Sequence, residues 1–223
     1  MKRFIPLFLI SLALSLPAQA QTPCVPEMGA PPEKGAAPEK CRIAAGDAAT
    51  ITPSQKITSF QAQVKSDIRK GLTDAQKQAF LNRMHDYFDF STMAEAALFG
   101  EWEKLTIEQR AQFSLAFTAM LQRNYLRKLY SHAEYLASIT GEKLKEDKAQ
   151  VATRLVKSAK GSTSVDVTYR MQKTKQGWRI YDVLTDEVSL IRNYRSTFAD
   201  LIKSKGFSGL MDHLKKQAAG PLP

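Results

Sequence analysis

Two different hydrophobic periods divide this chain of 223 residues. In the first half, apolar residues such as Ile57, Phe60 and Val64 recur every three or four positions, which predicts amphipathic helices. In the second half, apolar residues from Val165 to Met171 alternate with polar ones, which predicts strands with one buried face. Helices followed by a run of strands predict an α+β domain whose antiparallel sheet packs against helices.

Local signals place the ends of these elements. Thr73 with Gln76 and Thr106 with Gln109 match the capping box that begins a helix. Gly206 is expected to end the helix that follows the strands. The expected helices include about residues 93–98, 107–130, 189–205 and 208–217, and the expected strands cover about residues 135–145, 151–156, 165–171 and 178–184. Turns at residues 160–162 and 175–177 favour sequential antiparallel pairing into a four-stranded sheet.

The N-terminus has the pattern of a secretory signal peptide over residues 1–20. Lys2 and Arg3 precede an apolar run of 13 residues, and a small-x-small cleavage site ends at Ala20. The run is too short to cross a bilayer core, which needs about 20 residues. We therefore expect an exported, soluble protein that begins at Gln21 after cleavage.

Proline marks the start of the folded domain, because none occurs between Ser54 and Gly220. Residues 21–53 are predicted to form an irregular Pro-rich tail, residues 54–217 the folded domain, and residues 218–223 a disordered C-terminus. Both cysteines, Cys24 and Cys41, lie in the tail, and an oxidising compartment with an even count favours a disulfide between them.

The mature chain is basic, with 30 Lys and Arg against 22 Asp and Glu, a net charge of +8. Such a charge suits anionic membrane surfaces, lipid headgroups or acidic partners, and it equally suits a protein that is merely kept soluble. Export and the lack of a nucleic-acid-binding motif argue against DNA or RNA.

The usual catalytic signatures are absent from the sequence, and its three histidines are scattered, so we expect no metal site and no cofactor. Asp182 follows aromatic and apolar residues and has the chemistry of a general base in an apolar pocket. The other interpretation is that Asp182 pairs with a neighbouring basic residue, while Asp186 and Glu187 lie near the N-terminus of the next helix.

Several segments resemble the MlaC-type family of periplasmic phospholipid carriers, also described as toluene-tolerance or ABC-transporter auxiliary proteins. The matching segments are residues 87–90, 93–94, 100–102, 106–109, 178–183, 188–190, 193–198 and 209–210. The resemblance covers about residues 80–217. Glu187 departs from it, since family members often have Gly there, and the Cys-bracketed tail does not look like a family feature.

The resemblance implies an NTF2-like domain joined to a helical subdomain, with acyl chains between them and the headgroup near solvent. It also implies a monomeric, non-enzymatic carrier that shuttles phospholipid between an outer-membrane lipoprotein–porin complex and an inner-membrane ABC transporter with an MCE-domain protein. Bound phospholipid would be cargo, not a cofactor.

Aromatic, apolar and basic residues interleave from Gly177 to Phe198, as an apolar pocket with a basic mouth requires. The mouth is assigned to Tyr181, Tyr194 and Arg195. The expected lipid-binding walls are Phe117, Met120, Leu121, Tyr125, Val165, Val167, Tyr169, Ile180, Val183, Val188 and Phe198. Two alternatives stay open: an NTF2-like enzyme with Asp182 as base, and a periplasmic scaffold with a filled core.

Overall fold

The computed structural model describes residues 51–67, 72–131, 135–157, 164–220 and 222. The expected signal peptide, the Cys24–Cys41 disulfide and the turn at residues 160–162 lie outside these residues. The described residues all belong to one compact unit, Ala45–Pro223. In chain order its elements are α1 (Pro53–Asp67), α2 (Asp74–Arg83), η1 (Met84–Asp86), α3 (Phe90–Ala97), η2 (Trp102–Lys104), α4 (Ile107–Ser131), β1 (Tyr135–Lys145), β2 (Lys148–Lys157), β3 (Ser164–Thr174), β4 (Gly177–Thr185), β5 (Val188–Ser189) and α5 (Leu190–Ala218).

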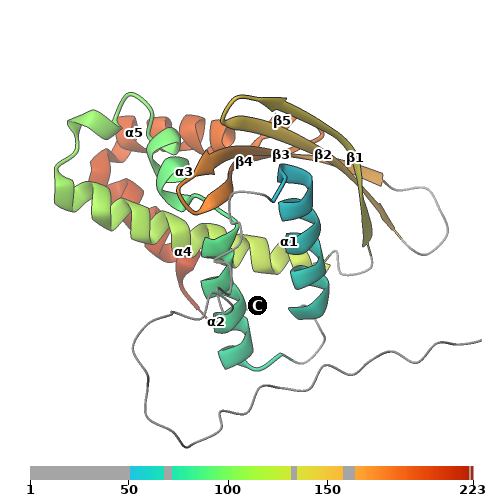
Figure 1. Cartoon of the computed structure of the whole chain (residues 1–223). Coiled ribbons are helices and arrows are strands. Elements are labelled where there is room, and N and C mark those ends of the chain that lie inside the picture. Colours follow the sequence, from blue (N-terminus) through green and yellow to red (C-terminus); the bar gives the residue numbers. More distant parts are fainter. Residues whose placement is uncertain (1–50, 68–71, 132–134, 158–163, 221, 223) are drawn as a thin grey trace, which may run out of the picture. The chain divides into compact units, whose positions relative to one another are not determined.

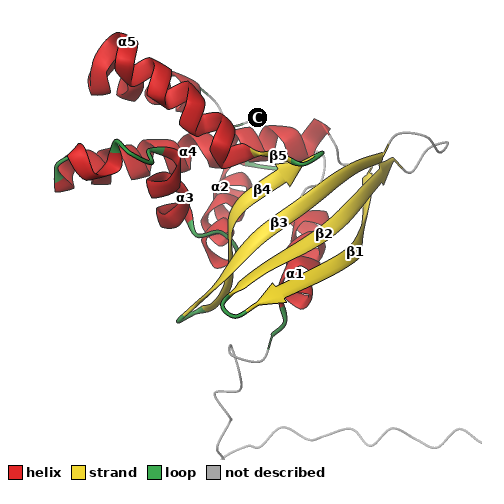
Figure 2. Ribbon diagram, turned by 90° about the horizontal axis from the view of Figure 1, so that it is seen from above, coloured by secondary structure: helices red, strands yellow, loops and turns green. Residues whose placement is uncertain are grey.

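The strands form one antiparallel sheet in the order β1-β2-β3-β4-β5 (Figure 2). The expected α+β class and the sequential pairing are confirmed, but the sheet has five strands where four were predicted. The additional strand, β5, has only two residues and is too short to show a period in the sequence.

A tight turn, Asp186-Glu187, joins β4 to β5. Both residues have positive φ, 46° and 66°, as the two central residues of a type I′ hairpin turn require. Gly is favoured at the second of these positions because it lacks a Cβ. Glu187 therefore occupies a backbone site that suits Gly, which gives a physical reason for the Gly that family members often have there but does not explain the Glu of this chain.

One face of the sheet carries the buried side chains, and we call it the inner face. Ala149, Val151 and Thr153 of β2 lie on it, as do Val167 and Met171 of β3, each with no more than 7% of its surface exposed. Residues directly opposite in the register share a face, so the remaining alternate positions form the outer face. In Figures 1 and 2, α1 crosses the sheet on one side of β1, β2 and β3.

A second packed group lies beyond the β4 edge, where α3, the first half of α4 and α5 come together (Figures 1 and 2). Phe113 and Phe117 of α4 stack at 5.4 Å between ring centroids, and Phe198 of α5 meets both rings edge-on. All three side chains are fully buried. The apolar stripes predicted on α4 and α5 thus pack against each other.

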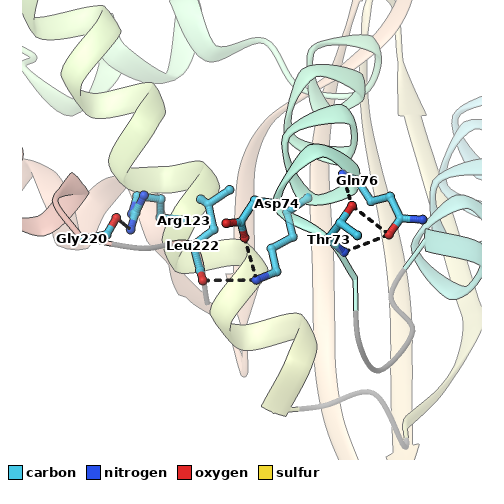
Figure 3. Close-up of polar contacts among 7 residues, drawn as sticks. Thr73, Asp74, Gln76, Arg123, Gly220 and Leu222 are labelled. Atoms are coloured by element: carbon cyan, nitrogen blue, oxygen red, sulfur yellow. Dashed lines mark hydrogen bonds and ion pairs between the residues drawn. The ribbon is translucent and has the colours of Figure 1, made fainter.

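The predicted helix signals are confirmed. Thr73 caps α2 with a reciprocal capping box to Gln76 (Figure 3), and Thr106 and Gln109 make the same two bonds before α4. The two helices expected after the strands abut as a single element, α5. Gly206 interrupts it with a non-helical backbone, φ 67° and ψ −178°, so the expected break is at the predicted glycine.

The end of the chain returns to α2 and α4. Arg123 of α4 donates to the backbone carbonyls of Ala219 and Gly220. Figure 3 shows the bond to Gly220, and the bond that Lys77 of α2 donates to the carbonyl of Leu222. Leu222 is partly buried against the core. These contacts tie the C-terminal residues to two helices that are distant in sequence.

Candidate functional site

The inner face of the sheet and the second half of α4 carry most of the residues predicted to line a pocket. Tyr169 and Ile180 on the sheet and Met120 on α4 are buried, with exposed fractions of 6%, 0% and 1%. The predicted residues that lie in this region are Met120, Leu121, Tyr125, Val165, Val167, Tyr169, Ile180 and Val183. The structure thus places a majority of the predicted set in one region.

An aromatic cluster forms the centre of this region. The Phe60 ring of α1 meets Tyr125 of α4 at 5.8 Å between centroids and Tyr169 of β3 at 6.5 Å. Phe88, which precedes α3, contacts both Phe60 and Tyr125. Sequence reasoning missed Phe60 and Phe88 as site residues. The aromatic run at residues 87–90 was a signal in the sequence for this cluster. In the structure, the backbone of this run pairs with Ile180 at the edge of β4.

Polar atoms lie inside this mostly apolar region. Burial raises the pKa of Tyr169 to about 12, and burial together with the nearby Tyr169 raises that of Tyr125 well above its ordinary value. Among the described residues, the buried Gln61 Nε2 of α1 and Tyr130 Oη of α4 have no hydrogen-bond partner. A buried polar atom without a partner costs about 1–3 kcal/mol. These two atoms therefore make the packing of α1 and α4 against the rest of the protein less favourable in free energy.

Three other predicted residues, Phe117, Tyr194 and Phe198, lie in the helical group. Tyr194 meets Phe117 edge-on and stacks on Phe198, each at 5.4 Å between centroids. Its hydroxyl accepts a hydrogen bond from Asn124 Nδ2 at 3.4 Å. Tyr194 thus belongs to the packing between α4 and α5, and the structure does not bring it to the inner face of the sheet.

The structure separates the remaining predicted residues. Arg195 Nε donates to the carbonyl of Ala96 at 3.1 Å, and its guanidinium lies over the exposed Phe99 ring. Tyr181 lies at the bulge of β4 on the outer face, where Lys148 Nζ is 4.6 Å from its ring centroid. Val188 in β5 is 55% exposed. The predicted mouth residues do not form a single rim.

Asp182 accepts several hydrogen bonds and is only 4% exposed. One carboxylate oxygen accepts from Ser189 Oγ at 2.7 Å and from Arg170 at 3.2 Å. The other accepts from the backbone amides of Val183 and Ile191. Asp182 therefore joins β3, β4, β5 and the first turn of α5, as expected of a carboxylate paired with a basic neighbour. Both oxygens are engaged within the protein.

Two hollows border the helices. One of about 380 Å³ lies between α1 and α2, and one of about 810 Å³ lies between α4, residues 85–91 and the β3–β4 turn. Neither is lined by a predicted wall residue. Along β1, by contrast, inner-face residues are open to solvent: Ile139 is 36% exposed and Leu144 is 60% exposed. The apolar inner face thus continues beyond the part that α1 covers.

The antiparallel sheet, with helices on its inner face and a helical group beyond its edge, is consistent with an NTF2-like α+β architecture. The family model described as MlaC protein matches residues 54–216. This match covers well over half of the chain, and the chain belongs to the MlaC family.

Two known proteins are similar to it. The intermembrane phospholipid transport system binding protein MlaC of Haemophilus influenzae is 20% identical over 144 residues, 63% of this chain and 67% of that protein. A solved structure of the phospholipid-binding protein from Ralstonia solanacearum in complex with a phospholipid has a TM-score of 0.65 and 20% identity. That match covers 73% of this chain and 94% of the other, and at this identity it establishes the shared fold alone.

No helix in the described ranges is both long and apolar enough to cross a membrane.

Proposed function

We propose that this protein binds a phospholipid and carries it through the periplasm between the outer and inner membranes. The observation that carries the proposal is the match of the MlaC family model to residues 54–216, which contain the whole sheet and nearly all of every helix. The phospholipid named for the Ralstonia solanacearum protein of the same fold supports the choice of cargo.

The acyl chains are proposed to lie between the inner face of the sheet and the helices α1 and α4. Because the Phe60 ring contacts both Tyr125 and Tyr169 here, lipid entry requires these helices to move away from the sheet. The open apolar edge at Ile139 and Leu144 gives the chains a starting point. The unpartnered atoms of Gln61 and Tyr130 lower the cost of separating α1 and α4 from their neighbours.

Burial of the tails supplies the free energy that drives this movement. Two acyl chains of about 15 methylenes each, at about 0.8 kcal/mol per buried methylene, give a gross gain of about 24 kcal/mol. Headgroup contacts are small beside this gain, so headgroup selectivity is loose. Spontaneous release into water is slow for the same reason, and handover needs a partner that opens the site.

The proposed partners are an outer-membrane lipoprotein–porin complex and an inner-membrane ABC transporter that carries an MCE-domain protein, as in an Mla-type system. The protein acts as a non-enzymatic carrier in this proposal. The engagement of both Asp182 oxygens by protein donors supports that choice over a general base.

Extraction of the purified protein with organic solvent, followed by mass spectrometry, tests the proposal. Stoichiometric phospholipid is expected for the wild type. The Val165→Glu variant places a carboxylate on the inner face and should lose most of the lipid, because a charge is costly beside acyl chains. Val156→Glu makes the same change on the outer face, where Val156 is 37% exposed, and should retain it.

Wild-type protein that extracts without phospholipid, and does not take it up from vesicles, would contradict the proposal and favour a scaffold with a filled core. If the two valine variants contain equal amounts of lipid, the protein is still a lipid carrier, but the acyl chains do not lie on the inner face. Melting temperatures of both variants show whether either change has disturbed the fold.

A further inference from the structure

Three lysines meet on the outer face of the sheet at the β1–β2 turn. Lys145 lies directly opposite Lys148, and Lys143 lies two residues earlier in β1, opposite Gln150. Their neighbours in β2, Ala149 and Val151, are buried on the inner face, so the alternation of a strand places these three lysines on the outer face. We call Lys143, Lys145 and Lys148 the lysine patch.

Ion pairing does not explain why these lysines lie opposite and beside one another. Like charges directly opposite each other destabilise an antiparallel pair. Within the described part of the chain, no carboxylate lies within ion-pair distance of the lysine patch, including the adjacent turn residues Glu146 and Asp147. Lys148 instead donates to Gln172 Oε1 at 2.8 Å and lies over the Tyr181 ring. The patch therefore presents positive charge that these residues do not neutralise.

More positive charge gathers at the same end of the sheet. The β3–β4 turn lies beside the β1–β2 turn, since the backbone amide of Lys173 donates to the carbonyl of Asp147 at 2.9 Å. The exposed Lys175 is in that turn. The exposed apolar residues of the outer face, Leu136 and Val156, pair near the opposite end of β1 and β2. The region around the lysine patch thus has an excess of lysines over the two turn carboxylates, Glu146 and Asp147, and the Tyr181 ring beside it is half-buried beneath Lys148.

This composition distinguishes between two kinds of anionic partner. Protein–protein interfaces are depleted in lysine and use aromatic and arginine anchors in desolvated pockets. A membrane surface with anionic headgroups attracts hydrated lysines without requiring such anchors, and the attraction acts over about a Debye length. We propose that the lysine patch docks this protein on the surface of a bilayer that contains anionic phospholipid.

The proposal is independent of the cargo site. The patch lies on the outer face, whereas the proposed acyl-chain site lies on the inner face of the same sheet. Docking therefore leaves the edge at Ile139 and Leu144 on the other side of β1. Loss of one activity does not require loss of the other, and the two can be tested separately.

Co-sedimentation of the mature protein with vesicles tests the docking. One set of vesicles contains phosphatidylcholine alone and the other contains phosphatidylcholine mixed with phosphatidylglycerol. The wild type should bind only the mixed vesicles, and more weakly as salt is added. The triple variant Lys143→Gln, Lys145→Gln, Lys148→Gln should bind them roughly 100-fold more weakly, at about fivefold for each basic residue removed.

The matched control is Lys203→Gln, Lys205→Gln, Lys215→Gln, which removes the same charge from exposed positions on α5. It should lose little binding. An equal loss in both variants would show that net charge alone attracts the protein, and the patch proposal would fail. It would also fail if the wild type bound the two sets of vesicles equally, or if the patch variant bound the mixed vesicles as tightly as the wild type does. Phospholipid extracted from the patch variant reports separately on the cargo site.

Discussion

Replacement of Asp182 by Asn tests whether this carboxylate is a structural junction. The side chain keeps its size, but one of its two oxygens becomes an NH₂ group. Each oxygen accepts two hydrogen bonds in the structure, one from Ser189 and Arg170 and the other from Val183 and Ile191. If the NH₂ group faces Val183 and Ile191, two backbone donors meet a third donor. If it faces Ser189 and Arg170, the arginine loses its acceptor and the serine hydroxyl has to turn round and accept.

The cost follows from these contacts. A buried donor left without an acceptor costs about 1–3 kcal/mol, and loss of the negative charge weakens the remaining bonds. The Arg170 side chain is 31% exposed and can form hydrogen bonds with water instead, so the loss of its bond to Asp182 adds little to this cost. We expect a loss of about 3 kcal/mol from a total stability of about 5–15 kcal/mol. For a domain of this size, the melting temperature should fall by about 6–12 °C.

Urea unfolding followed by circular dichroism measures the change, with Asp212→Asn as the control. Asp212 is exposed on α5, so the same chemical change there should alter stability by less than about 0.5 kcal/mol. If Asp182→Asn unfolds at the same urea concentration as this control, the junction role is wrong. If the variant then also loses turnover of a small substrate, the general-base alternative gains support.

Three further outcomes follow from local features. Glu187→Gly should raise stability by about 0.5–1 kcal/mol, because φ is 66° there, and a lower urea midpoint would contradict this. Thr73→Ala should cost about 1 kcal/mol through the lost cap of α2, measured by the same unfolding curves. Burial raises the pKa of Tyr169 to about 12, so the folded state holds the proton more tightly and stability falls as pH rises from about 10. Tyr169→Phe should therefore lose roughly 1 kcal/mol less than the wild type between about pH 9 and 11, and equal losses would oppose the assignment.

Sequence reasoning succeeded where the signal is local. The capping boxes at Thr73 and Thr106 involve residues three positions apart, and both form as predicted. Gly206 marks the break in α5 because its backbone needs a positive φ. Alternation predicted the four long strands, whereas β5 offered only two residues, and no period can be read from so short a segment.

The candidate site was harder to predict because it depends on which apolar stripes meet. The spacing of Tyr194 and Phe198 showed a buried face on a helix, but not that Phe117 of α4 would cover it. Phe60 lies more than 100 residues before Tyr169 in the sequence, yet their rings meet across the inner face. Tyr181 is the unpaired residue of the bulge in β4, and the shift in register there places its ring on the outer face.

Strand β1 ends the sheet on one side and spans 11 residues, ten of them exposed. An edge strand of this kind exposes unpaired backbone N–H and C=O groups, and pairing of these groups with another copy of the chain leads to fibre-like association. The irregular register between Ile139 and Gly141 and the charged Lys143 and Lys145 oppose that outcome. Replacing those lysines by neutral residues therefore also weakens the protection of β1 against aggregation. Light scattering of concentrated samples should accompany any work with such variants.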